Sequence, residues 1–218
     1  MVHLNNAHSN MVTQQVRPGE VLDARVLATM TNIPREHFVD SDMARLAYAD
    51  TQLPIGYGQL MLSPIQEGRF LQALNLQSSE TVMELGTGSG YFTALLAQLA
   101  GQVISVEYFA ELSELAAQRL EQLGIDNVSL QVGDASKSWS LPDRIDAIVM
   151  TAAYVTVPDH YLHQLRVGGR LLVVTGEAPA MSVQLIRRVS EWDWQAETLF
   201  ETVIPAVINA EPKVEFEF

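Results

Sequence analysis

Residues 82–91, with the sequence VMELGTGSGY, constrain the fold of this chain more than any other stretch. The apolar start indicates a buried strand, and Gly86, Gly88 and Gly90 allow the backbone to turn sharply into the helix-compatible segment 92–99. Glycines at such a turn let a ligand approach the backbone, and the first amides of the following helix attract an anionic group. The segment therefore predicts a ligand-binding loop at the edge of an α/β sheet.

Two carboxylates follow the next two predicted strands. Glu107 comes directly after the strand-like segment 102–106, where an acid can accept hydrogen bonds from both hydroxyls of a ribose. Asp134 follows the strand-like segment 128–132; alone it would be typical of a turn, but here it can accept from the exocyclic amine of an adenine. Because consecutive parallel strands end at one edge of a sheet, we expect Glu84, Glu107 and Asp134 to meet at one crevice.

Three interpretations of the glycine loop differ in what they require. A strand-to-helix turn that binds nothing would need no distal acids. A nicotinamide or flavin dinucleotide loop has the spacing G-x-G-x-x-G, whereas Tyr91 occupies the third glycine position here. Glu84, ahead of the loop, would repel a pyrophosphate and attract the amino group or sulfonium of a methionine moiety. These features favour S-adenosyl-L-methionine, with its carboxylate at the helix N-terminus.

From about residue 78 onward, strands and helices alternate in the pattern of a doubly wound parallel sheet. The later elements are predicted as a helix at 111–123, a strand at 144–150, a helix at 158–165, a strand at 169–175, and antiparallel strands at 182–189 and 197–208. Ahead of the sheet, 11–31 has helical spacing interrupted at Pro18-Gly19, and 54–64 is predicted to be a loop or cap over the crevice. We expect one compact domain with two regions: a helical extension with a substrate cap (1–77) and a core (78–218).

The composition of the chain restricts which binding partners and which cellular compartment are expected. The formal net charge of −13 over 218 residues opposes nucleic-acid backbones, and no apolar run reaches the ~18 residues of a membrane span. The polar start lacks a signal-peptide pattern and the chain has no cysteine, as is typical of the reducing cytoplasm. His160 and His163 lie one helical turn apart without a third ligand nearby, which indicates a solvated helix face and no metal site.

The chain resembles the protein-L-isoaspartate O-methyltransferase family. The resemblance covers MVTQQVR (11–17), IPREHFV (33–39), AYAD (47–50), LPIGYGQ (53–59), the glycine loop, Gly133-Asp134 and TAA (151–153). It implies a Rossmann-like class I methyltransferase with a seven-stranded, mostly parallel sheet. It also implies S-adenosyl-L-methionine as donor, S-adenosyl-L-homocysteine as product, and methylation of the free carboxylate of isoaspartyl residues in damaged proteins.

The expected donor site combines the loop, the two distal acids and their neighbours. Its residues are Gln59, Glu84, Gly86, Thr87, Gly88, Ser89, Gly90, Glu107, Tyr108, Asp134 and Ala135.

The chain departs from the family where the acceptor is expected. Members typically follow Gly-Gln with Thr-Ile-Ser, one further residue and Pro, whereas this chain has LMLSP at 60–64. Leu60 thus stands for the threonine and Leu62 for the serine regarded as catalytic, which leaves Ser63 as the candidate catalytic hydroxyl. Near the C-terminus, TVIPA at 202–206 lacks the arginine of the family's Arg-Phe-Val-Pro-Leu.

These departures leave the acceptor open. Transfer of a methyl group to a carboxylate needs positioning more than a base, so isoaspartyl methylation can survive the loss of one hydroxyl. Alternatively, Leu60 and Leu62 re-specify the pocket for a more apolar acceptor, because an unpaired carboxylate is expensive to desolvate. Two further alternatives remain: the leucines simply pack under the cap, or the protein binds the cofactor without isoaspartyl activity.

Overall fold

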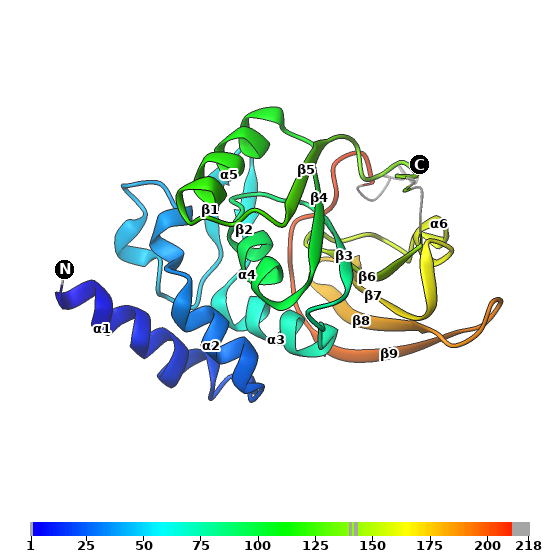
Figure 1. Cartoon of the computed structure of the whole chain (residues 1–218), viewed down its shortest axis with the longest axis horizontal. Coiled ribbons are helices and arrows are strands. Elements are labelled where there is room, and N and C mark those ends of the chain that lie inside the picture. Colours follow the sequence, from blue (N-terminus) through cyan, green and yellow to red (C-terminus); the bar gives the residue numbers. More distant parts are fainter. Residues whose placement is uncertain (1, 140, 142–143, 211–218) are drawn as a thin grey trace, which may run out of the picture.

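A computed structural model describes residues 2–139, 141 and 144–210, and its centre is a seven-stranded sheet (Figure 1). The strand order is β5-β4-β3-β6-β7-β8-β9, with β3, β4, β5, β6 and β7 parallel and the last two strands antiparallel. The strands are β3 (Thr81–Leu85), β4 (Gln102–Glu107), β5 (Val128–Val132), β6 (Ile145–Met150), β7 (Leu165–Glu177), β8 (Ala180–Arg188) and β9 (Trp194–Glu201). The predicted fold class and sheet are confirmed.

Alternation along the central strands divides the core between the two faces of the sheet. Val82 faces one cluster, which also contains the buried side chains of α2, α3 and α4, whereas Met83 and Leu85 face the other. The helices are α1 (Val2–Asn10), α2 (Ala24–Asn32), α3 (Pro64–Leu74), α4 (Tyr91–Leu99), α5 (Ala110–Gln122) and α6 (Asp159–Leu162). No helix in the described ranges is long and apolar enough to cross a membrane.

Three predicted boundaries near the C-terminus are wrong. The predicted helix 158–165 is a single turn, because β7, predicted to begin at 169, already begins at Leu165 and pairs with Ile145. The irregular pairing that follows is accommodated by Gly168, whose φ is 87°. The last strand ends at Glu201 rather than 208, and Ala206, after Pro205, instead forms an isolated parallel bridge with Ala153.

The N-terminal region differs in detail from the prediction. A π-helix, η1 (Met11–Val16), continues directly from α1, and two 3₁₀ turns follow α2, η2 (Arg35–Phe38) and η3 (Ala44–Leu46). Segment 54–64 is not a loop: β1 (Leu53–Gly56) and β2 (Gln59–Met61) form an antiparallel hairpin. Figure 1 shows the N-terminal helices at the opposite end of the molecule from the β8–β9 hairpin.

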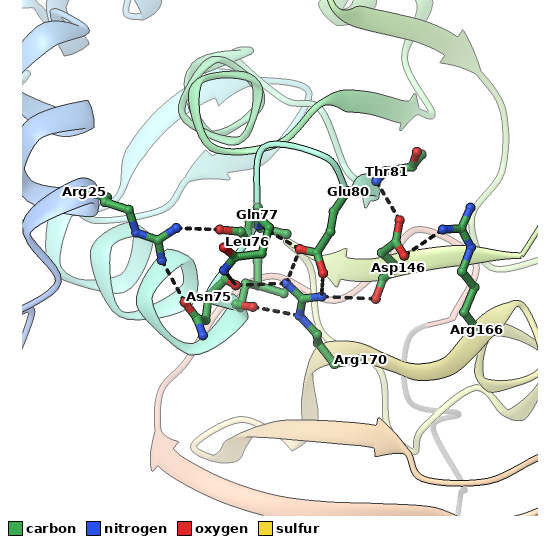
Figure 2. Close-up of polar contacts among 10 residues, drawn as sticks. Arg25, Asn75, Leu76, Gln77, Glu80, Thr81, Asp146, Arg166 and Arg170 are labelled. Atoms are coloured by element: carbon green, nitrogen blue, oxygen red, sulfur yellow. Dashed lines mark hydrogen bonds and ion pairs between the residues drawn. The ribbon is translucent and has the colours of Figure 1, made fainter.

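A polar network closes the amino ends of the strands (Figure 2). The buried Arg170 donates to both carboxylate oxygens of Glu80, at 2.6 and 2.7 Å, and to the carbonyl oxygens of Leu74 and Asn75 at the end of α3. Asp146 accepts from Thr81 N at 2.9 Å and so joins the starts of β3 and β6. These hydrogen bonds join the end of α3 to β3, β6 and β7 at the amino edge of the sheet.

Candidate active site

One cavity opens at the carboxyl ends of the parallel strands, beneath the β1–β2 hairpin. Nine of the predicted donor-site residues line it: Gln59, Gly86, Thr87, Gly88, Ser89, Glu107, Tyr108, Asp134 and Ala135. Glu84, Gly90 and Ser63 are not among its lining residues. The fold thus brings most of the predicted site together and places three of its members elsewhere.

The glycine loop needs its glycines for two separate reasons. Gly86, Gly88 and Gly90 have φ angles of 103°, 53° and 87°, a region that L side chains rarely adopt. A Cβ on Gly86 would also collide with Oγ1 of Thr151, which donates to the Gly86 carbonyl oxygen at 2.6 Å. Gly90 faces away from the cavity and packs against Ala116 of α5, so its role is close packing at the start of α4.

Glu107 links the glycine loop to the next strand. Its Oε2 accepts from the backbone amide of Gly88 at 2.8 Å, and its Oε1 accepts from that of Phe109 at 3.1 Å. These bonds hold the carboxylate in a defined orientation at the cavity wall. Both oxygens remain acceptors for further donors, because each carries two lone pairs.

Glu84 does not face the ligand cavity as predicted. Along β3, side chains alternate between the faces, and Glu84 points under α4, where Oε2 accepts from Thr93 Oγ1 at 2.5 Å and Ser105 Oγ at 2.6 Å. Burial raises the pKa of this carboxyl to about 8, although the two hydroxyls lower it. Ser105 Oγ also lies 2.5 Å from Oγ1 of Thr87, so Glu84 contacts the cavity wall only indirectly.

Asp134 is held in a tight local turn beside the cavity. Its Oδ1 accepts from the amide and hydroxyl of Ser136, at 3.0 and 2.6 Å, and Oδ2 accepts from Asn209 at 3.1 Å. Burial raises its pKa, but these hydrogen bonds outweigh burial and hold the pKa below its usual value. The carbonyl oxygen of the next residue, Ala135, accepts a hydrogen bond from the hydroxyl of Tyr154. This bond ties this end of the cavity to the C-terminal half of the core.

The β1–β2 hairpin lies over the cavity as a cap. Ile55 and Gln59 line the cavity from above, and the tip residue Tyr57 stacks on Phe109 with ring centroids 4.5 Å apart. Tyr57 itself has a φ of 53° and is half exposed. The hairpin tip is therefore fastened to the loop that follows Glu107.

Ser63 does not replace the missing hydroxyl. Leu60 and Leu62 line the cavity, whereas Ser63 points the other way and caps α3, with Oγ accepting from Gln66 N at 3.5 Å and its own amide donating to Gln66 Oε1 at 2.8 Å. Leu60, Met61 and Leu62 all line the cavity, and the lining ends where Ser63 begins to cap α3. Thr202, at the place of the family arginine, accepts from Gln66 and is likewise outside the cavity.

Sequence reasoning missed Glu67 and Arg35. Glu67 lines the cavity although only 1% of its surface is exposed, and the fully buried Arg35 forms an ion pair with it. Burial raises the pKa of Glu67 to about 7, although Arg35 lowers it. The sequence did contain a signal for Glu67. This acid falls on the apolar face of α3, one turn before Leu71 and two turns before Leu74, where an apolar residue is expected.

The two histidines proposed as a solvated pair are partly packed. His160 lies against the ring of Tyr161, with centroids 4.2 Å apart, and His163 lies edge-on against Trp194 at 5.0 Å. Across the residues that the structure describes, no three histidine, aspartate or glutamate side chains form a group suited to a metal ion.

Comparison with known proteins identifies the family. Residues 5–209 match the family Protein-L-isoaspartate(D-aspartate) O-methyltransferase. The chain belongs to this family. It is 41% identical over 202 residues to protein-L-isoaspartate O-methyltransferase 2 of Pelobacter propionicus, covering 92% of this chain and 90% of that protein. It is also 41% identical over 181 residues to the Syntrophus aciditrophicus enzyme of the same family name, covering 83% of each.

Solved structures agree on the fold of this methyltransferase. A Plasmodium falciparum chain in complex with S-adenosyl-L-homocysteine superposes with a TM-score of 0.81 at 20% identity, covering 92% of this chain and 97% of that one. A second structure, titled protein-L-isoaspartate O-methyltransferase, gives a TM-score of 0.79 at 24% identity over 91% of this chain and 65% of that one. The core and the N-terminal region thus share one architecture with these chains.

Proposed function

We propose that this protein is an S-adenosyl-L-methionine-dependent O-methyltransferase that methylates the free carboxylate of L-isoaspartyl residues in damaged proteins and releases S-adenosyl-L-homocysteine. The observation that carries the proposal is the convergence of the glycine loop, Glu107 and Asp134 on one cavity, in a chain that belongs to this family. The relatives at about 40% identity carry the name of this activity.

The donor is assigned to the core side of the cavity. The backbone of residues 86–89 and the start of α4 would receive its carboxylate, because amides and the helix dipole favour an anion there. Glu107 would accept from the ribose hydroxyls, and Asp134 with Ala135 would border the adenine. Glu84 supports this loop from behind through Ser105 and is a positioning residue.

The acceptor is assigned to the N-terminal side. Region 1–77 supplies the hairpin, Leu60 and Leu62, while region 78–218, whose last eight residues lie outside the described part of the chain, supplies the donor site. The bound donor supplies an electrophilic methyl group on a cationic sulfur. An acceptor carboxylate is already ionised at neutral pH, so the protein needs no base and acts by orienting the two groups and excluding water.

Partners and compartment follow from composition. A damaged protein or peptide is the proposed partner, and the net charge of −13 argues against nucleic acid. The absence of cysteine from the sequence suits a reducing compartment, and we propose the cytoplasm.

The test is methylation with labelled donor of an isoaspartyl peptide, beside the same peptide with ordinary aspartate. We expect label in the isoaspartyl peptide only, in a preparation that binds S-adenosyl-L-homocysteine by calorimetry. Donor binding without turnover on this peptide would contradict the assignment. Turnover on an apolar acceptor instead would establish the re-specified pocket, and the double variant Leu60→Thr/Leu62→Ser should then gain isoaspartyl activity.

Ser63→Ala separates the capping role of Ser63 from a catalytic one. We expect the rate to stay within about 3-fold, because the hydroxyl does not line the cavity, and the free energy of unfolding to fall by about 1 kcal/mol as a helix cap is lost. A loss of about 100-fold in rate with unchanged stability would instead restore Ser63 as the catalytic hydroxyl.

A further inference from the structure

Glu67 and Arg35 form a buried ion pair at the cavity wall. Nη1 of Arg35 contacts Oε2 of Glu67, and Nη2 of Arg35 donates to the carbonyl oxygen of Leu62 at 2.5 Å. Among the hydrogen bonds of the described residues, the Glu67 carboxylate accepts at Oε2, from Arg35, and none reaches Oε1. The pair therefore holds the wall at Leu62 and leaves one carboxyl oxygen free for a ligand.

The side chains around the cavity are electrostatically one-sided. Glu67, Glu107 and Asp134 line it, and no lysine, arginine or histidine is among the described residues that do. A carboxylate that enters this space needs a hydrogen-bond donor, because an unpaired buried carboxylate is strongly destabilised. Leu60 and Leu62 offer none.

Two threonine hydroxyls of the wall are already engaged, and the hydroxyls of Ser89 and Tyr108 belong to the glycine loop and the end of β4. Oγ1 of Thr151 donates to the Gly86 carbonyl, and Oγ1 of Thr87 is bonded to Ser105. The amide of Gln59 turns back toward its own hairpin. Glu67 is thus the buried side chain with a free oxygen on the side of the cavity where the hairpin and α3 meet.

We propose that Glu67 recognises the acceptor: its protonated carboxyl donates a hydrogen bond from Oε1 to one oxygen of the isoaspartyl carboxylate, while Arg35 holds Oε2. This assignment rests on the proposed function. During transfer, the second acceptor oxygen forms the C–O bond to the methyl group as the S–C bond of the sulfonium breaks, and the electron pair of that bond stays on sulfur. The proton stays on Glu67.

Burial and the charged neighbours of Glu67 together set the pKa of its carboxyl close to neutral pH. Burial raises its pKa to about 7, Arg35 on η2 lowers it, and Asp50 ahead of β1 raises it further. Tyr91 of α4 faces the pair from below and lies 5.1 Å from the Arg35 guanidinium carbon. Above the pKa of Glu67, its charge would repel the acceptor, so acceptor binding should weaken as the pH rises.

The test is calorimetric binding of an acetylated, histidine-free isoaspartyl peptide to the S-adenosyl-L-homocysteine complex at pH 6, 7 and 8. We expect the Kd of the wild type to rise about 10-fold over this range as Glu67 ionises. In Glu67→Gln the amide donates at every pH, so the Kd should be nearly constant. Glu111→Gln is the matched control and should keep the wild-type profile, because Glu111 is exposed and does not line the cavity.

A second variant guards against misfolding of Glu67→Gln, in which Arg35 keeps only an amide oxygen as its partner. Arg35→Met/Glu67→Met replaces the whole pair by apolar side chains, which buried pairs often tolerate. This variant should bind S-adenosyl-L-homocysteine normally and the peptide about 10-fold more weakly at pH 6.

The outcomes separate the two proposals. A pH dependence that persists in Glu67→Gln, or normal peptide binding by the double variant, overturns the role of Glu67 and leaves isoaspartyl methylation intact if the wild type turns over. The expected binding profile without any methyl transfer supports the role of Glu67 and overturns the proposed function. A wild-type complex that does not bind the peptide overturns both.

Discussion

The network around Arg170 and the carboxyl edge of the sheet differ in how their buried polar groups are paired. At the amino edge, Arg170 reaches Glu80 and three backbone carbonyls, and Figure 2 shows these partners converging on its guanidinium. At the carboxyl edge, Arg35 Nε, Glu84 Oε1 and the Tyr91 hydroxyl are buried without a partner in the described residues. None of the unpartnered buried atoms belongs to the network around Arg170.

The difference separates groups that stabilise the fold from groups kept for chemistry. A buried polar atom without a partner costs about 1–3 kcal/mol, so it persists where function requires it or where other contacts compensate. The raised pKa values of Glu67 and Glu84 follow from the same burial at the carboxyl edge. Changes at the amino edge should therefore affect stability, and changes at the carboxyl edge should affect binding and pH dependence.

The largest expected effect is that of Arg170→Ala at the amino edge. Removing this guanidinium leaves Glu80 and the carbonyls at the end of α3 without their donor, which should lower the free energy of unfolding by about 3–5 kcal/mol. Urea titration measures this loss. The folded variant should bind S-adenosyl-L-homocysteine with a Kd within about 2-fold of wild type, because a substitution far from the cavity has little effect on binding there. A larger change in Kd would mean that the two edges are coupled.

Glu107→Ala should reverse that pattern. Loss of the carboxylate removes the acceptor assigned to the ribose and frees the amide of Gly88, so S-adenosyl-L-homocysteine should bind about 100-fold more weakly, equivalent to about 2.7 kcal/mol. Calorimetry measures the Kd, and the exposed acid Glu111 provides the matched control, Glu111→Ala. Equal affinities of the two variants would remove Glu107 from the donor site.

Glu84→Gln tests the carboxyl edge through pH. The raised pKa, about 8 against an ordinary 4.5, means that the folded protein holds a proton that the unfolded chain has lost. Stability from this proton is complete below about pH 4.5 and is lost as the pH rises through about 8, with a slope of at most about 1.4 kcal/mol per pH unit. The variant should flatten this decline in urea titrations from pH 5 to 9; a slope identical to wild type would show that Glu84 is ionised throughout.

The smallest expected effect is that of Arg166→Ala, beside Arg170. Arg166 bonds Asp146 at 3.0 Å, but about half of its side chain is exposed, so the free energy of unfolding should fall by only about 0.5 kcal/mol. The same urea titration compares it with Arg170→Ala. A loss as large as that of Arg170→Ala would mean that exposure does not distinguish the two arginines.

Sequence reasoning succeeded where the determining contacts are local. Gly86 and Gly88 turn the chain directly after β3, and Glu107 and Asp134 each close a parallel strand, so strand order alone brings them to one edge. Glu84 lies in the same motif, yet it points under α4 rather than into the cavity. The position of Glu84 next to the glycine loop in the sequence therefore did not predict which face of the sheet its side chain lies on.

Long-range packing decided the acceptor end. Arg35 and Glu67 lie 32 positions apart, and only the tertiary fold brings their side chains together. Ser63, by contrast, is committed to the start of α3 by a local capping box with Gln66.

The sequence by itself determined the parallel sheet, the glycine loop and the acids that follow its strands, because each depends on backbone geometry within one strand–turn–helix unit. Only the tertiary structure decided that Glu84 supports the loop from behind, that Ser63 lies outside the cavity, and that Glu67 reaches it. Those roles depend on which buried surfaces meet, and burial of a charged group has a cost that only its three-dimensional partners can offset.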